Sequence, residues 1–370
     1  MAVDWAPYNL IYTLYSNSTF YGLIKKTYIL QYDTIYMVMD NETEYRKIQK
    51  TGGSSYIITL PKKWIVDNNL KEGSQLRVST KEDGSLVVDC KNLETSTNNT
   101  YELVIENIDE SLLIRRLIAV YLGGYKIIKI KSENVMNNNI KETVEKFCSL
   151  VIGIEIIEEE RDYIILQDIS NQSDLSMMKI LGRMYLMASS MVKDVISILN
   201  NYDKKLAEGV VKRDLQVDRL NWLISKNFNM VLLNKQHVDN NQVLSFDIKS
   251  VARLLERISD HAENIARILI DLELPLYNVK DVKMLEEYLK DADEFLENSY
   301  ECYLQKNFEK ANEIIDRIEL FYNKMEKYIF NIEKGKEYNF GAITLVAESI
   351  MRIAMYSADM CEITINESVI

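Results

Sequence analysis

The sequence is poor in the residues from which small chemical centres are most often built. It contains four cysteines, none in a CxxC pair, and two histidines. Widely spaced cysteines disfavour a zinc knuckle or a disulfide framework and are typical of a reducing cytoplasm. Because His237 falls in a polar stretch, no histidine, carboxylate and nucleophile are expected to converge. The sequence therefore predicts a protein that is not an enzyme.

Long apolar runs and phosphate-binding loops are also missing. The run Tyr28–Met39 is broken by Gln31 and Asp33, and no segment approaches the roughly 20 apolar residues of a membrane span. Neither GxGxxG nor GxxxxGK[ST] occurs, and Gly123-Gly124 is interpreted as a helix C-cap. We expect a cytoplasmic protein without membrane insertion and without a nucleotide site.

Positive charge is the scarcer sign, and it is concentrated in one segment. Lys and Arg number 44 against 56 Asp and Glu, which gives a net charge of −12. From Arg46 to Val78, seven basic and two acidic residues give +5, so the rest of the chain carries −17. This polarisation is typical of a DNA-binding head on an acidic body. The alternative is that these basic side chains only protect strand edges.

A chain of 370 residues with 47% hydrophobic and 27% charged residues is expected to fold as several domains. Residues 1–44 show no sustained periodicity and form an unassigned N-terminal extension, with Met37 and Met39 as alternative translation starts. The predicted domains are a small hairpin β domain at 45–90, a small α/β domain at 91–172, and two three-helix bundles at 173–276 and 277–370.

The segment 45–90 has the pattern strand, turn, strand, short helix, then a final hairpin. Gly52 and Gly53 favour a turn with positive φ, Pro61 favours a helix start, and Asp83-Gly84 favours the last turn. So small a unit has too few apolar side chains for a core of its own. We therefore predict that it forms a homodimer by interleaving strands with a second copy.

Residues 101–170 alternate between short strands and helices, which predicts a split βαβ unit or small α/β sandwich. From Ser173 onward the apolar period is helical, and breaks in it predict six helices in two sets of three. The expected elements of the α/β part are strands at 101–105, 126–130, 154–157 and 163–166 and helices at 112–121 and 140–150.

Paired carboxylates mark the third predicted helix of the first bundle. Glu256 and Asp260 lie four residues apart opposite an apolar stripe, and the preceding helix offers Asp214 and Asp218. Such pairs can share an oxygen-ligated cation. A solvated acidic face remains the alternative. We interpret His261 as a helix-surface residue rather than a ligand.

The hairpin segment carries a family resemblance. The run TGGSSYIITLPKKWIVDNNLKEGSQLRV resembles the SpoVT/AbrB swapped-hairpin family in its turn, its Leu-Pro before the short helix and its Leu-x-x-Gly before the last strand. The resemblance implies a dimer that binds DNA. The contacts we expect come from Arg46, Lys47, Lys50 and Arg77.

The carboxylate helix carries a second resemblance. ERISDHAENIA and the Asp-x-x-x-Asp of the preceding helix resemble signatures of the PhoU family, whose carboxylates ligate transition-metal ions. The resemblance implies that an iron, zinc or manganese ion binds the first bundle alone. Its implied ligands are Asp214, Asp218, Glu256 and Asp260, with Asn264 adjacent. The implied second-bundle counterparts are Met351 for Glu256, Tyr356 for Asp260, and the companion pair Asn312 and Asp316.

The two resemblances together match archaeal-type phosphate uptake regulators. They imply a phosphate-responsive regulator that binds DNA as a dimer. The alternative is a non-DNA-binding adaptor that acts on phosphate transporter components or other signalling proteins. A metal-dependent hydrolase is disfavoured, because hydrolysis needs a sheltered pocket with a positioned acid or base.

Overall fold

A computed structural model gives the fold of residues 44–53, 55–80, 84–89, 100–106, 108–170, 176–233, 242–272, 279–331 and 340–368. The expected N-terminal extension up to residue 43, His237 and Pro275 lie outside these ranges. The chain divides into two compact units, residues 1–95 and 96–370, which are described separately.

The first unit consists of two hairpins and one short helix. β1 (Gln49–Thr51) pairs antiparallel with β2 (Ser55–Ile57), and β3 (Arg77–Thr80) with β4 (Leu86–Asp89). α2 (Lys62–Asp67) follows Pro61, which is the N-cap rather than the first helical residue. Gly52 has a φ of +63°, as the sequence predicted for the first turn. The two hairpins remain separate two-stranded sheets.

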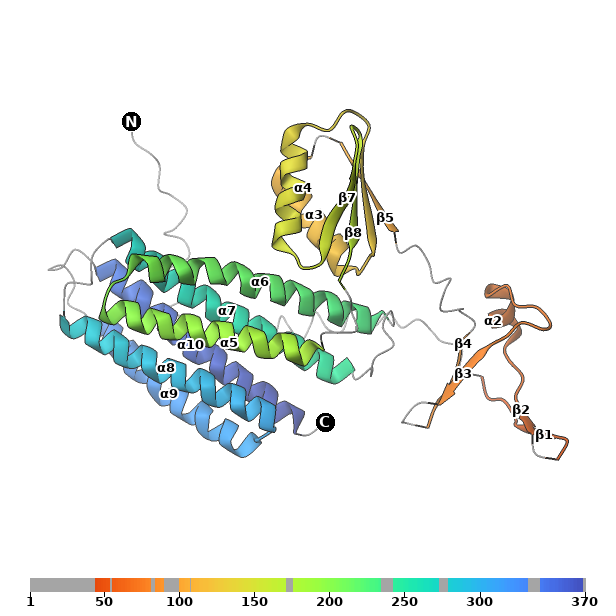
Figure 1. The fold of residues 1–370 in the computed structure, drawn as a ribbon. Coiled ribbons are helices and arrows are strands. Elements are labelled where there is room, and N and C mark those ends of the chain that lie inside the picture. The colour runs from red at the N-terminus through yellow and green to blue at the C-terminus, as the bar shows by residue number, and fades with distance from the viewer. Residues whose placement is uncertain are drawn as a thin grey trace, which may run out of the picture. The chain divides into compact units, whose positions relative to one another are not determined.

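The α/β part of the second unit is a four-stranded sheet in the order β5-β6-β8-β7. Its strands are β5 (Thr100–Ile105), β6 (Ile127–Ser132), β7 (Ile154–Glu159) and β8 (Tyr163–Asp168), and β5 runs parallel to β6. Helices α3 (Glu110–Leu122) and α4 (Asn138–Leu150) cover one face of the sheet (Figure 1). Leu117 and Phe147 from these helices pack against Ile128 and Ile164 of the sheet in one buried cluster. The alternation expected from the sequence is confirmed.

Local signals fix the ends of these helices. The side chains of Asp109 and Asn137 accept hydrogen bonds from the N–H groups of Ser111 and Ile140, at 3.1 and 2.9 Å. Such capping satisfies donors that the first turn of a helix leaves without partners. At the end of α3, Gly124 has a φ of +69°, as predicted for a C-cap glycine.

Six long helices follow within the described residues. They are α5 (Met177–Asn200), α6 (Lys204–Leu232), α7 (Gln242–Leu272), α8 (Val279–Gln305), α9 (Phe308–Asn331) and α10 (Phe340–Glu367). They lie side by side in Figure 1 and share one apolar cluster. The predicted fold class, a hairpin β part, an α/β part and a helical bundle, is confirmed. None of the helices in the described ranges is long and apolar enough to cross a membrane.

The second set of three helices repeats the burial pattern of the first. Asp203 and Asn307 each precede a helix and accept a hydrogen bond from the N–H three residues later, at 3.2 and 3.0 Å. Counted from these caps, the buried Ala207 of α6 corresponds to the buried Ala311 of α9. The buried positions of α7 recur in α10 in the same way when Ile258 is matched to Ile353. The helical part is therefore an internal repeat.

Candidate metal centre on helices 6 and 7

The predicted carboxylates meet where α6 packs against α7. Asp214 and Asp218 come from α6 and Asp260 from α7, and one carboxylate oxygen of each lies within 4.8 Å of the others. Asp214 is buried, whereas Asp260 is exposed. The set therefore reaches from the helix interface to solvent, which leaves a cation a route of entry.

Glu256, the fourth predicted ligand, lies one turn before Asp260 on α7 and is not part of the group within 4.8 Å. Its Oε1 accepts a hydrogen bond from Arg253 Nη1 at 3.0 Å, while its Oε2 is buried without a hydrogen-bond partner. Asp214 Oδ1 is also buried and unpartnered. Buried carboxylate oxygens are costly without a partner. Two such atoms beside a carboxylate cluster fit a site that a cation would complete.

Burial controls the protonation of the cluster. It raises the pKa of Asp214 to about 8, with further contributions from Asp218, Glu263 and Asp260. Burial likewise raises the pKa of Asp218 to about 6 and that of Glu256 to about 7, and it raises the pKa of Asp260. The protein environment thus disfavours several adjacent negative charges, which a bound cation would neutralise.

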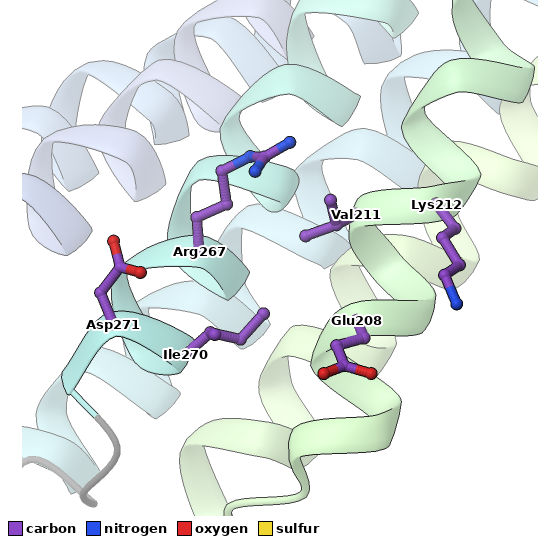
Figure 2. Close-up of a pocket in the computed structure, with 6 residues that line it drawn as sticks. All are labelled: Glu208, Val211, Lys212, Arg267, Ile270 and Asp271. Carbon is purple, nitrogen blue, oxygen red and sulfur yellow. The ribbon is translucent and has the colours of Figure 1, made fainter.

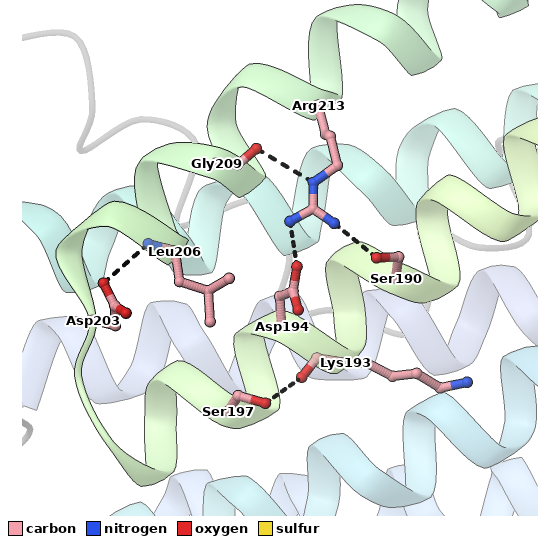
Figure 3. A network of polar contacts seen from close by, with 8 residues as sticks. All are labelled: Ser190, Lys193, Asp194, Ser197, Asp203, Leu206, Gly209 and Arg213. Atoms are coloured by element: carbon pink, nitrogen blue, oxygen red, sulfur yellow. Dashed lines mark hydrogen bonds and ion pairs between the residues drawn. The ribbon is translucent and has the colours of Figure 1, made fainter.

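Arg213, the residue before Asp214, joins α6 to α5. Arg213 donates hydrogen bonds to Ser190 Oγ at 2.7 Å and to Asp194, both on α5. Figure 3 shows its guanidinium reaching from α6 to α5, with a third bond to the carbonyl of Gly209. Because Arg213 holds α6 to α5, the next side chain, Asp214, is directed toward α7.

Several neighbours differ from the sequence expectations. The Asn264 Nδ2 donates to Ser349 Oγ at 3.0 Å and so turns toward α10. His261 is half-buried rather than on the surface, and its ring lies 5.8 Å from that of Tyr356 on α10. Burial, with Arg352 and Arg257, lowers the pKa of His261 to about 4. Glu263, which no sequence motif singled out, adds negative charge beside the cluster and pairs with Arg267.

At the described positions that correspond to these ligands, the second half of the bundle carries no carboxylates. The cap register places Ile318 and Tyr322 of α9 where α6 carries Asp214 and Asp218. The expected pair Asn312 and Asp316 is therefore wrong in register, and both residues are exposed.

On α10 the register confirms Met351 as the counterpart of Glu256. It corrects the counterpart of Asp260 to Met355, and Tyr356 corresponds to His261. Across the described ranges, Asp214, Asp218 and Asp260 are the group of this kind that could hold a metal.

A shallow cavity of 270 Å³ lies further along the same pair of helices. Figure 2 shows its lining residues, which come from α6 and α7. Two acidic and two basic side chains surround an apolar floor, so their charges balance and no group of ligands of one type converges. The lining residues are Glu208, Val211, Lys212, Arg267, Ile270 and Asp271.

The DNA-binding candidates belong to the first unit. Lys50 lies on β1 and Arg77 on β3, while Arg46 and Lys47 precede β1. All four are exposed, and Arg46 forms an ion pair with Glu44. They are thus distributed over two separate hairpins.

Comparison with known families identifies both parts. Residues 181–269, which include α6 and most of α7, match the PhoU domain. Over these residues the chain is similar to the PhoU domain. Residues 49–92 match the antidote-toxin recognition MazE family of bacterial antitoxins, which confirms the AbrB-like character expected of the hairpins. The PhoU match contains all four predicted metal ligands.

Relatives of the PhoU domain are found among curated proteins and solved structures. A phosphate-specific transport system accessory protein PhoU homolog of Clostridium acetobutylicum is 25% identical over 192 residues, covering 50% of this chain and 86% of the relative. PhoU of Pseudomonas aeruginosa is similar at 16% identity and a TM-score of 0.45, over 52% of this chain and 95% of its own. The phosphate transport system regulatory protein PhoU of Streptococcus pneumoniae gives 19% identity and 0.45, over 52% and 93%.

Proposed function

We propose that this protein is a cytoplasmic, phosphate-responsive regulator that contacts DNA as a dimer through its hairpins and binds a metal ion on its PhoU domain. The observation that carries the proposal is the presence, in one chain, of an exposed basic hairpin module and a PhoU-like region whose carboxylate cluster reaches from a buried Asp214 to an exposed Asp260. The involvement of phosphate rests on the Clostridium acetobutylicum relative, which is an accessory protein of a phosphate-specific transport system.

The exposed apolar side chains of the hairpin module support a dimer. None of its described residues between 44 and 88 is buried in the single chain. Tyr56, Val66 and Leu86 are 69%, 62% and 59% exposed. Two-stranded hairpins with exposed apolar side chains are marginally stable alone in water. A second copy that interleaves its hairpins would cover these side chains and give the module a core.

The charge of the module supports DNA as its partner. The segment from Arg46 to Val78 carries +5 and the rest of the chain −17, and dimerisation doubles the positive charge at one place. Lysine and arginine side chains that neutralise DNA phosphates supply most of the non-specific affinity. An acidic body repels DNA, so binding would be confined to the module.

The carboxylate cluster fits a resident cation. Asp214, Asp218 and Asp260 would hold it, and Glu256, one turn before Asp260 on α7, would lie beside it. Among iron, zinc and manganese, an all-carboxylate set suits manganese, because zinc is more often bound by thiolate and imidazole. The bound ion would supply positive charge that joins α6 to α7.

An adaptor function without DNA is the second candidate. The Clostridium acetobutylicum relative aligns over 86% of its length with 50% of this chain, so most of its length corresponds to only part of the present protein. A PhoU-type protein can therefore serve a transport system without a large additional module. In that case the hairpins would only join two copies, and the bundle would contact transporter components or a signalling protein.

Salt-dependent DNA retention of the full chain separates the two functions. Replacing Arg46, Lys47 and Lys50 by alanine should weaken retention and reduce the slope of log affinity against log salt by about 0.9 for each lost phosphate contact. A matched control replaces three exposed lysines of α8 and α9, Lys283, Lys324 and Lys327, and should leave the slope unchanged. Equal slopes for wild type and both variants would contradict DNA binding through the module and favour the adaptor.

A further inference from the structure

Helix α6 carries the candidate metal ligands and also holds the α/β part of the same unit. Arg219 Nη2 donates to the carbonyl of Val151 at 3.3 Å, and Asn229 Nδ2 donates to the carbonyl of Leu122 at 3.0 Å. Between them, Lys226 Nζ donates to Asp168 Oδ2 at the end of β8. These contacts follow one stripe of α6 for almost three turns. We call them the α6 junction.

The centre of the α6 junction is an ion pair removed from water. The side chains of Lys226 and Asp168 are 1% and 3% exposed. The other oxygen of Asp168 accepts the N–H of Ser170 at 3.0 Å, and the Lys226 ammonium lies 4.8 Å from the centre of the Tyr121 ring. A buried ion pair adds little net stability compared with apolar packing, but losing one partner is costly. The pair therefore favours the one position of α6 against the α/β part in which both charges keep their partners.

Close packing at the α6 junction leaves little room for α6 to slide. Gly124 has a positive φ, and a Cβ there would lie 2.8 Å from Cγ of Met230 on α6. Trp222 packs against the apolar core of the α/β part. Because packed interiors do not deform continuously, a shift of α6 must either move the α/β part or break these contacts.

The metal centre adjoins the α6 junction directly. Asp218 precedes Arg219 in the chain, so the last metal ligand of α6 and the first junction contact are neighbours on one helix. Without a cation, the carboxylates of α6 and α7 repel one another. With one, the same oxygens hold α6 to α7. Both sites thus act on the position of one rigid helix.

We propose that α6 couples the two sites, so that a cation bound by Asp214, Asp218 and Asp260 tightens the α6 junction and the intact junction strengthens cation binding. The inference rests on the proposed metal function. It implies that the contacts of the α/β part with α6 change when a cation binds to the PhoU-like region. Coupling of binding free energies is reciprocal, so each site must change the other by the same factor, typically fivefold or more.

Hydrogen exchange of the full chain with and without Mn²⁺ tests the coupling. The informative amides are Asp168 N–H, which donates to the Lys126 carbonyl at 2.8 Å, and Ile169 N–H, which donates to the Gly153 carbonyl at 2.7 Å. Mn²⁺ should slow their exchange by about fivefold or more. The paired variant Lys226→Met with Asp168→Asn removes both charges together, and the asparagine oxygen can still accept from Ser170. In it the slowing should disappear and Mn²⁺ affinity should fall by the same factor.

The matched control is the exposed ion pair between Arg317 and Glu294, changed to Arg317→Gln with Glu294→Gln. It should preserve both the slowing and the affinity. Slowed exchange around 214–218 with no change at 168–169 in the wild type would overturn the coupling and leave the metal site intact. Absence of Mn²⁺ binding by the wild type would instead reject the metal function, and the coupling with it. The wild-type comparison decides even if the paired variant does not fold.

Discussion

The two halves of the helical bundle have the same scaffold but different chemistry on one face. In α5–α7 the interface of the second and third helices carries Asp214 and Glu256, while the corresponding places in α8–α10 carry Ile318 and Met351. Both Asp214 and Ile318 are buried. The second half thus shows that apolar side chains fill these positions when only packing is required. The first half departs from it at the positions where buried oxygens lack partners.

The difference indicates that the carboxylate cluster lowers the free energy of unfolding of the metal-free protein. A buried, unpartnered carboxylate is unfavourable, and an apolar side chain at the same place of the repeat packs without that cost. Sites at which a protein breaks its own packing rule are often functional. The comparison of the halves therefore supports a ligand for the cluster without reference to any relative.

Exchanging the residues of the two halves should give the largest effects. Ile318→Asp would bury a carboxylate without ligands and should lower the free energy of unfolding by about 3–5 kcal/mol. Asp214→Ile should raise that of the metal-free protein by about 1–3 kcal/mol, because it removes an unsatisfied buried group. Urea denaturation in the presence of chelator measures both. Similar changes of the same sign would contradict the assigned register of the repeat.

Removing the metal ligands should abolish stabilisation by metal. At a free Mn²⁺ concentration 100 times the dissociation constant, binding to the folded state alone adds about 2.7 kcal/mol to the free energy of unfolding. Asp214→Asn with Asp218→Asn should eliminate this gain, seen as a lost rise in melting temperature. The control Asp316→Asn changes an exposed carboxylate of the second half and should leave the rise intact. A rise that survives in the double variant would show that Mn²⁺ binds elsewhere.

The pH dependence of stability should differ between the wild type and the ligand variant by a smaller amount. Burial raises the pKa of Asp214 to about 8 and of Glu256 to about 7, whereas in the unfolded chain such groups titrate near 4. The folded state then binds more protons, so the free energy of unfolding of the metal-free protein falls as pH rises from about 4 through about 8.

The variant Asp214→Asn with Asp218→Asn should show a shallower fall. Metal should act in the opposite direction, because it binds deprotonated carboxylates and its stabilisation should grow over the same pH range. Thermal melts with and without chelator at several pH values measure both trends. Identical profiles for wild type and variant would contradict the pKa assignments.

Most strands and helices could be predicted from the sequence, whereas the register of the second half and the buried Lys226 could not. Periodicity, caps and turn glycines such as Gly52 and Gly124 are local signals, and they located nearly every strand and helix. The register of the second half was misplaced at Asp316 and Tyr356, because the ligand positions have no carboxylates left to align there. Burial and the Asn307 cap restored it. Lys226 was missed, since no local pattern marks a lysine whose partner, Asp168, lies in another part of the unit.

Metal content of the purified full chain tests the central claim most directly. After exposure to Mn²⁺ and removal of free ion by gel filtration, elemental analysis should find bound metal in the wild type and in Asp316→Asn. It should find none above background in Asp214→Asn with Asp218→Asn. Metal-free wild-type protein, or metal retained by the double variant, would show that the cluster of α6 and α7 is not the metal centre of this protein.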